Sequence, residues 1–145
     1  MIRRADPGDA DAWIRMRSLR WPESADDHKV EVSRYFDGNQ HDPAAVFIAI
    51  EGSEPVGFAE ASLRSHAEGC TSSPVAYLEG WYVEPSVRRK GIGRALLDAV
   101  ETWGRSEGCS ELASDALLDN AVSIDAHGRL GFTETDRIVC FKKGL

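Results

Sequence analysis

The sequence predicts an α/β fold in which a mixed, mostly antiparallel sheet carries helices on both faces. Two observations predict it. Apolar runs of strand length follow one another in the middle of the chain, and a strand–helix–strand crossover comes after them. The 145 residues contain no internal repeat and no linker-like stretch. A chain of this length is typical of one domain, which we expect to span residues 1–145.

The first quarter of the chain is predicted to be helical. Asp6 is a helix cap, and Pro7 after it suits the first helical position. We expect this helix to run to about Leu19, because the Trp-Pro pair at 21–22 ends it. A weaker helix is predicted from Asp27 to Phe36.

The next part of the chain is predicted to form strands. Ala45–Ile50 is an apolar run, and a turn at residues 52–55 leads into Val56–Leu63, so the pair is typical of an antiparallel hairpin. A loop at residues 65–74 follows, and Val75–Val83 is the next strand. A helix is expected from Ile92 to about Trp103, and Gly108 stops it. A strand from Glu111 to Ser114 follows, and then a helix that Asp119 or Asn120 caps and that ends near Leu130. The chain is expected to end in further strands, of which Ile138–Phe141 is the clearest.

The charge balance argues against a nucleic-acid-binding protein. Lys and Arg number 17 against 24 Asp and Glu, which gives a net charge of −7, whereas phosphate neutralisation needs clustered cations. The sign suits a cationic partner, although it also fits plain solubility. No apolar run approaches the ~20 residues that span a bilayer. No apolar stretch follows the two arginines near the N-terminus, so we expect no signal peptide and a cytoplasmic protein.

The cysteines indicate neither a disulfide framework nor a zinc site. Cys70, Cys109 and Cys140 are odd in number, widely spaced and without a Cys-x-x-Cys pair. We therefore expect no metal and three cysteines that are small buried apolar residues, with a reactive thiol as the alternative.

A site for a phosphate-bearing ligand is predicted between residues 81 and 94. A strand ends there, the cations Arg88, Arg89 and Lys90 follow, and two glycines open a long helix. Glycines let backbone N–H groups approach a ligand, and a helix N-terminus supplies free donors and a positive dipole end. The alternative is an exposed charged turn.

The spacing of this segment selects among the known phosphate loops. Gly-x4-Gly-Lys-Ser/Thr is absent, and Leu96 stands at the third glycine of a dinucleotide fingerprint. Residues 88–93, Arg-Arg-Lys-Gly-Ile-Gly, resemble the coenzyme A pyrophosphate loop of the GNAT acetyltransferase superfamily, and residues 130–132 lie where that family has its second signature. The resemblance implies a GNAT fold and acetyl-CoA as cosubstrate. The cofactor-binding residues that it implies are Trp81, Tyr82, Val83, Arg88, Arg89, Lys90, Gly91, Ile92, Gly93, Arg94 and Asn120.

Acetylation of an amine needs a neutral amine beside the thioester, a route for its proton and stabilisation of the oxyanion. Glu79, within the apolar strand, and Asp115, at the end of the next strand, are the candidate groups. Strand alternation leaves open that Glu79 points to solvent. Asp115 and Asp136 are also open to a plain surface role.

Several segments resemble the aminoglycoside 6′-N-acetyltransferases within that superfamily: Trp21-Pro22, residues 69–74, 77–80, 112–115 and 131–135. The resemblance implies that the Trp21 ring packs on a sugar, and that Glu79, Asp115 and Asp136 hold drug amines. A core role for Trp21 stays open. Aminoglycosides are polycations, which an acidic cleft attracts.

Two histidines depart from the pattern of these relatives. His66 stands where they carry a drug-contacting tyrosine, which leaves that contact open. His127 stands where many GNAT enzymes carry a tyrosine that protonates the departing thiolate. Histidine can donate a proton near neutral pH, but His127 is also open to a structural role. The expected mechanism is direct attack of the amine on the thioester, with Glu79 taking its proton through water and the Val83 N–H polarising the thioester oxygen.

Two rival functions stay open at this point. One is a GNAT enzyme for another amine, such as a polyamine, an amino acid or a protein N-terminus. The other is a non-catalytic acyl-CoA-binding sensor. The resemblance also implies a homodimer, in which Ile138–Phe141 could pair across a two-fold axis; an ordinary internal strand is the alternative.

Overall fold

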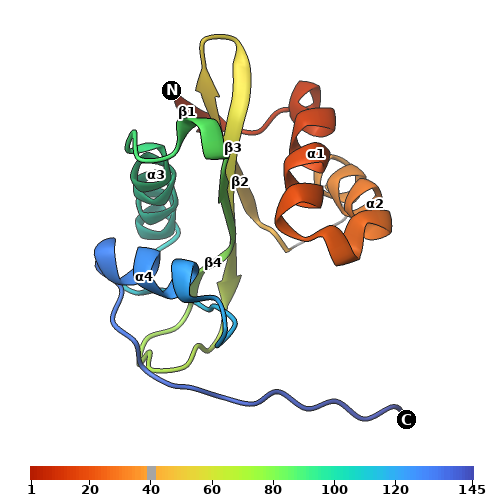
Figure 1. Ribbon diagram of the computed structural model, residues 1–145. Coiled ribbons are helices and arrows are strands. Elements are labelled where there is room, and N and C mark those ends of the chain that lie inside the picture. The colour runs from red at the N-terminus through yellow and green to blue at the C-terminus, as the bar shows by residue number, and fades with distance from the viewer. Residues whose placement is uncertain (39–41) are drawn as a thin grey trace.

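The computed structural model describes residues 1–38 and 42–145, which contain a five-stranded sheet in the order β1-β2-β3-β4-β5 (Figure 1). Neighbouring strands are antiparallel except for β4 and β5, which are parallel. The strands are β1 (Ile2–Arg4), β2 (Ala45–Glu51), β3 (Glu54–Arg64), β4 (Val75–Val83) and β5 (Leu112–Ser114).

Helices cover both faces of this sheet. The helices are α1 (Ala10–Arg20), α2 (Ala25–Phe36), α3 (Ile92–Ser106) and α4 (Ala121–Arg129). Figure 1 shows α1 and α2 on one side of the strands and α3 and α4 on the other. The predicted mixed α/β architecture is therefore confirmed.

Among the described residues, the sheet separates the two larger of three hydrophobic clusters; the third is small and contains Tyr77. Trp13 and Met16 of α1 pack with Phe58 of β3 on one face, and Leu96 and Val100 of α3 form the centre of the core on the other face. Strand alternation explains the split, because successive strand residues point to opposite faces. All five of these side chains are fully buried.

Two predicted helix starts are confirmed at the level of individual hydrogen bonds. Asp6 accepts from the Gly8 N–H at 2.8 Å, and Asp9 accepts from the Asp6 N–H at 2.8 Å, which is a capping box. The Asn120 side chain accepts from the Ser123 N–H at 3.1 Å. Asn120, and not Asp119, is therefore the cap of α4.

A β-bulge interrupts β4 where it approaches the candidate site. Glu60 pairs with Gly80 and Ala61 pairs with Leu78, so Glu79 is an extra residue in β4. Strand β5 pairs with β4 only as far as Leu78. Within the described residues, the side of β4 that faces away from β3 is thus unpaired beyond the bulge.

A buried charge network lies beneath α1 on the same face as Trp13. Glu60 is 3% exposed, accepts from the Trp13 indole at 2.9 Å and pairs with Arg17 at 3.1 Å. Arg17 also pairs with Glu31 of α2. Burial raises the pKa of Glu60 to about 7, against the opposing charge of Arg17 and the hydrogen bond from Trp13.

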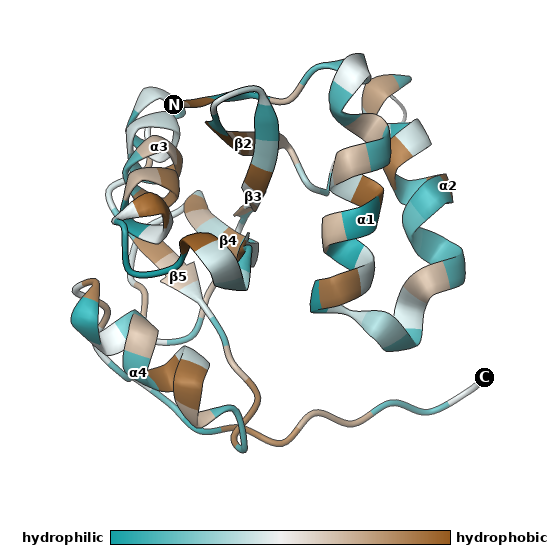
Figure 2. Ribbon diagram, turned by 45° about the horizontal axis from the view of Figure 1, so that its top comes forward, coloured by the Kyte–Doolittle hydropathy of each residue, from teal (hydrophilic) through white to brown (hydrophobic). Residues whose placement is uncertain are grey.

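The structure corrects the sequence-based expectation at both ends of the chain. Strand β1 was not expected, since three residues carry too little alternation to be recognised. The predicted strand Ile138–Phe141 is wrong for this chain: residues 132–145 form neither helix nor strand. Ile138 and Phe141 are 55% and 91% exposed, and both views show the segment running away from the body (Figures 1 and 2). A strand needs a partner for its backbone groups, and this segment pairs with none of the described strands.

No helix among the described residues has the length and apolar character needed to cross a membrane.

Candidate active site

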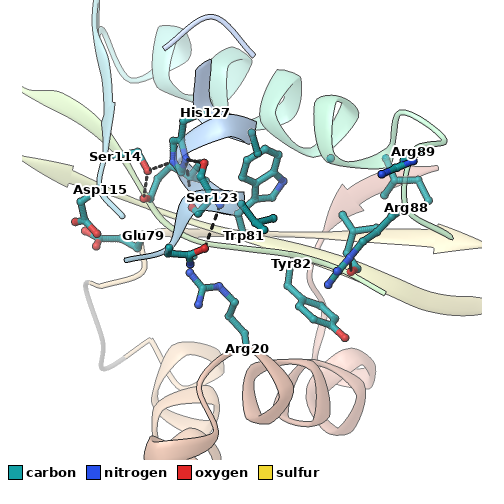
Figure 3. Close-up of a pocket in the computed structure, with 18 residues that line it drawn as sticks. Arg20, Glu79, Trp81, Tyr82, Arg88, Arg89, Ser114, Asp115, Ser123 and His127 are labelled. Carbon is teal, nitrogen blue, oxygen red and sulfur yellow. Dashed lines mark hydrogen bonds between the residues drawn. The ribbon is translucent and has the colours of Figure 1, made fainter. Parts of the chain in front are cut away.

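A cavity of about 380 Å³ lies beside the unpaired part of β4, between β5, the N-terminus of α3 and α4. Most of the predicted site residues line it. In Figure 3, Arg88 and Arg89 lie toward one end, Glu79 and Asp115 toward the other, and Trp81 and His127 between them. The predicted residues that line the cavity are Glu79, Trp81, Tyr82, Val83, Arg88, Arg89, Ile92, Gly93, Asp115, Asn120 and His127.

The end of the cavity that contains Arg88 and Arg89 has the features of an anion-binding site. Gly91 is the N-cap of α3, with φ of 80° in the left-handed region, and Arg89 has φ of 64°. Helix α3 begins directly after this turn, so the N–H groups of its first turn have no acceptor within the helix. Together with two guanidinium groups, these donors fit the pyrophosphate of coenzyme A. A Cβ on Gly93 would lie 3.0 Å from the Trp81 ring, which explains the second glycine.

Two predicted cations of the loop point elsewhere. Lys90 pairs with Glu51 at 3.4 Å, and Arg94 donates to the Arg129 carbonyl at 3.4 Å. Neither lines the cavity.

The backbone of β4 offers a donor beside the cavity. Arg88 Nε donates to the Val83 carbonyl at 2.8 Å from the side opposite β3, while the next residue, Glu84, donates its N–H to Val56 beside β3. Because the N–H and C=O of one strand residue point to the same side, the Val83 N–H also faces away from β3. Val83 lines the cavity, so this N–H is a candidate donor for a ligand bound there.

His127 lies between the two ends and is held in one orientation. Its Nδ1 lies 2.7 Å from the Ser123 carbonyl, which can only accept, so Nδ1 carries a hydrogen. Its Nε2 lies 2.8 Å from Ser114 Oγ. The ring packs edge-on against Trp81 and Phe132. Ser114 Oγ also lies 3.2 Å from the Leu78 carbonyl, and both Ser114 and His127 line the cavity.

The acidic end contains the two predicted carboxylates. Glu79 is fixed by Ser62, whose hydroxyl donates at 2.6 Å, and by a two-pronged ion pair with Arg64. Asp115 accepts from the Tyr77 hydroxyl at 2.5 Å. Both acids line the cavity, so the bulge does turn Glu79 toward the site.

Trp21 lies at the edge of the α1–α2 core and next to the site. Its ring covers Gly80, where any Cβ would clash with the indole, and Gly80 lines the cavity. His28 contacts the Trp21 carbonyl at 2.9 Å. The structure thus combines the two alternatives for Trp21, a core contact and a place beside the acidic end of the cavity.

Two predicted substrate contacts do not reach the cavity. His66 is on the loop between β3 and β4, with a side chain 73% exposed and Glu68 at 3.9 Å. Asp136 is exposed on the C-terminal segment. Neither residue lines the cavity.

Sequence reasoning missed other residues of the site. Arg20, Ser114 and Ser123 line the cavity, and Ser62, Arg64 and Tyr77 lie behind the two acids. Arg20 directly precedes Trp21 in the sequence, and Ser114 directly precedes Asp115, so proximity to predicted residues was the available signal. Among residues 1–38 and 42–145, no three His, Cys, Asp or Glu side chains lie close enough together to hold a metal ion.

Comparison with known sequences identifies the family. The profile of the acetyltransferase (GNAT) family matches residues 11–132. The chain is 45% identical to an aminoglycoside N(6′)-acetyltransferase type 1 of Klebsiella aerogenes, over 100% of this chain and 97% of that protein. It is 40% identical to a protein of the same name from Salmonella typhimurium, over 98% of this chain and 97% of that protein.

Comparison with solved structures agrees. The aminoglycoside acetyltransferase AAC(6′)-Iy, in complex with the bisubstrate analogue CoA-S-monomethyl-acetylneamine, superposes with a TM-score of 0.92 at 37% identity, over 100% of this chain and 98% of that one. AAC(6′)-Ih from Acinetobacter baumannii superposes with a TM-score of 0.90 at 37% identity, with the same coverage. The chain belongs to the GNAT acetyltransferase family and, within it, to the aminoglycoside N(6′)-acetyltransferases.

Proposed function

We propose that this protein transfers the acetyl group of acetyl-CoA to the 6′-amine of aminoglycoside antibiotics and so confers resistance to them. One observation carries the proposal. A single cavity has an anion-binding helix terminus at one end and two fixed carboxylates at the other. That arrangement fits a phosphate-bearing acyl donor and a polycationic acceptor that meet at the centre, as in the bisubstrate analogue bound by AAC(6′)-Iy.

The donor would be held by backbone and cations together. The first turn of α3, with Arg88 and Arg89, binds the pyrophosphate. The unpaired side of residues 81–83 aligns the pantetheine arm, and Asn120 lies beside it. The Val83 N–H then polarises the thioester oxygen.

The acceptor is oriented by the acidic end. Glu79 and Asp115 hold its ammonium groups by charge-assisted hydrogen bonds. Glu79 takes a proton from the 6′-ammonium, through water, and the neutral amine attacks the thioester carbonyl. The C–S bond breaks as the C–N bond forms, and His127 delivers a proton through Ser114 to the departing thiolate. The Trp21 ring, fixed on Gly80, packs against the sugar.

The outer part of the drug would meet two residues that lie outside the cavity. His66 and Asp136 are on neighbouring segments, because Thr135 Oγ1 donates to the Glu68 carbonyl at 3.4 Å. We propose that both contact the amines and hydroxyls of a bound drug that project beyond the cavity.

Two closely related drugs test the function. With acetyl-CoA, we expect rapid thiol release with neomycin and almost none with paromomycin, which carries a hydroxyl in place of the 6′-amine. Equal rates with both would keep the acetyltransferase but move the reaction to another amine. Binding of acetyl-CoA without turnover of either drug would favour the peptide-acceptor or sensor functions.

We also propose that the protein is a homodimer, in which each C-terminal segment pairs with the partner. Ile138, Val139 and Phe141 are 55%, 74% and 91% exposed, on a segment that extends from the body. Exposed apolar side chains in an extended chain are typical of a strand that is completed by another copy.

Light scattering after size-exclusion chromatography measures this directly. The unaltered protein is expected to have twice the chain mass, and Phe141→Asp is expected to shift it toward the monomer. Leu19→Asp is the matched control, because Leu19 is an exposed apolar residue of α1. A monomeric unaltered protein would contradict the dimer.

Finally, we propose that residues 1–145 act as one catalytic domain in the cytoplasm. Both hydrophobic cores pack on the same sheet. All three cysteines are free, as is usual in a reducing compartment. Cys109 is buried and Cys70 partly so, whereas the expected burial of Cys140 is wrong, because it lies exposed on the C-terminal segment.

A further inference from the structure

Three side chains that do not line the cavity stand directly behind its two acids. Ser62 is fully buried and donates to Glu79 Oε1 at 2.6 Å. Arg64 donates to the same oxygen from Nε at 3.0 Å and from Nη2 at 2.9 Å, and Nη2 also reaches Oε2 at 2.9 Å. Oε1 is therefore saturated with donors, whereas Oε2 keeps capacity for a further one.

Arg64 also connects Glu79 to the second acid. Its guanidinium carbon lies 3.5 Å from the centre of the Tyr77 ring, a close cation–π stack. The Tyr77 hydroxyl donates to Asp115 Oδ2 at 2.5 Å. Tyr77 is 7% exposed, so the stack rests on a side chain that has little freedom to move.

The chemistry of these groups suits orientation rather than proton transfer. Burial raises the pKa of Tyr77 well above its ordinary value, and the Asp115 hydrogen bond raises it further, so Tyr77 remains a neutral donor. Burial lowers the pKa of Arg64, but the hydrogen bonds and charge of Glu79 outweigh this effect and leave it raised. Neither group titrates near neutral pH.

We propose that Arg64 and Tyr77 are positioning residues that lock Glu79 and Asp115 into one unit, with a fixed separation between the two carboxylates. The proposal rests on the proposed function. A fixed pair of carboxylates receives two ammonium groups of one spacing at once, which places the 6′-amine without further rearrangement. The stack joins the two acids, because each acid is bonded to a different member of it, and the charge of Asp115 acts on Arg64 as well.

The planar geometry of arginine is essential to this role. A guanidinium can grip a carboxylate with two nitrogens while its face rests on a ring, whereas a lysine ammonium is a point charge that cannot do both. Arg64→Lys therefore retains the charge and loses the link.

A double-mutant cycle on the proposed acetylation of neomycin tests the unit. Arg64→Gln breaks the grip on Glu79, and Tyr77→Phe removes the bond to Asp115 while keeping the stack. We expect each to lower kcat/KM by about 10–100-fold, the effect of a hydrogen bond to a charged group. If the four side chains act as one unit, the double variant loses little more than the worse single variant. Arg64→Lys should resemble Arg64→Gln.

Matched controls separate positioning from general stability. Tyr35→Phe alters a tyrosine of the α1–α2 core, and Arg105→Gln alters an exposed arginine that pairs with Glu101. Both should keep the unaltered kcat/KM. The Kd of acetyl-CoA should stay within about twofold in every variant, because the donor end is untouched.

Three results would overturn the proposal: losses that multiply in the double variant, full rescue by Arg64→Lys, or a parallel weakening of acetyl-CoA binding, which indicates a merely structural role. These failures leave neomycin turnover by the unaltered protein intact. Absence of that turnover would instead remove the proposed function, and this inference with it.

Discussion

Replacing Glu79 with glutamine is expected to lower kcat by about 10²–10⁴-fold, the usual contribution of a positioned general base. Glutamine has the shape of glutamate, and its carbonyl oxygen can still accept from Ser62 and Arg64. Its amide nitrogen cannot accept the bond that Arg64 Nη2 gives to Glu79 Oε2 at 2.9 Å, so glutamine loses this contact and the charge as well as the capacity to take the proton from the ammonium. The loss should therefore appear in kcat, measured as thiol release at saturating acetyl-CoA and neomycin.

Binding of the donor should be unchanged in this variant, because Arg88 and Arg89 lie at the other end of the cavity. Titration calorimetry with acetyl-CoA checks this. Glu101→Gln is the matched control: it changes an exposed ion pair with Arg105 on α3 and should keep full activity. A loss of less than about threefold in Glu79→Gln would show that Asp115 or water accepts the proton unaided.

Replacing Glu60 with alanine is expected to destabilise the protein by about 1–3 kcal/mol, the cost of leaving a buried donor without its acceptor, while Arg17 keeps its pair with Glu31. The side chain of Arg17 is 8% exposed, and its Nε faces Glu60 at 3.1 Å. Alanine would also leave the buried Trp13 indole N–H without its acceptor. Urea unfolding at one pH measures the change in free energy of unfolding.

The same carboxyl group predicts a pH dependence of stability. The pKa of Glu60 is raised from 4.5 to about 7, so the folded protein holds a proton that the unfolded chain releases. Its contribution is complete below about pH 4.5 and is lost as the pH rises through about 7. Relative to Glu60→Gln, which does not titrate, the unaltered protein should lose free energy of unfolding between pH 5.5 and pH 8, two values on either side of that pKa. An unchanged difference between the two proteins over this interval would show that Arg17 keeps Glu60 ionised.

The donor end of the site could be predicted from sequence because its signals are local. Cations, glycines and a helix start lie within a few residues of each other, and the chain itself brings them together. The same holds for the Asp6 capping box and for the hairpin of β2 and β3.

The contacts behind the acceptor end could not be predicted in this way. Arg64 and Glu79 are 15 residues apart in sequence, and Tyr77 and Asp115 are 38 apart. Their contacts depend on strand register and on the bulge at Glu79. A one-residue slip in register would turn these side chains to the other face and abolish the contacts. The apolar pattern at Ile138–Phe141 is typical of a strand, but such a pattern does not say whether the same chain provides a strand edge for it to pair with.

The division of the protein into two cores has a consequence for how such an enzyme changes under drug selection. The acceptor end draws on Trp21 beside the α1–α2 core and on Glu79 and Asp115, whereas the donor end draws on α3 and its glycine turn. Substitutions around the acceptor end can change which antibiotic is acetylated, while the residues that bind coenzyme A stay the same. Resistance to a new drug is thus expected to arise through changes at α1, α2 and the loop after β3, with residues 88–93 held nearly constant.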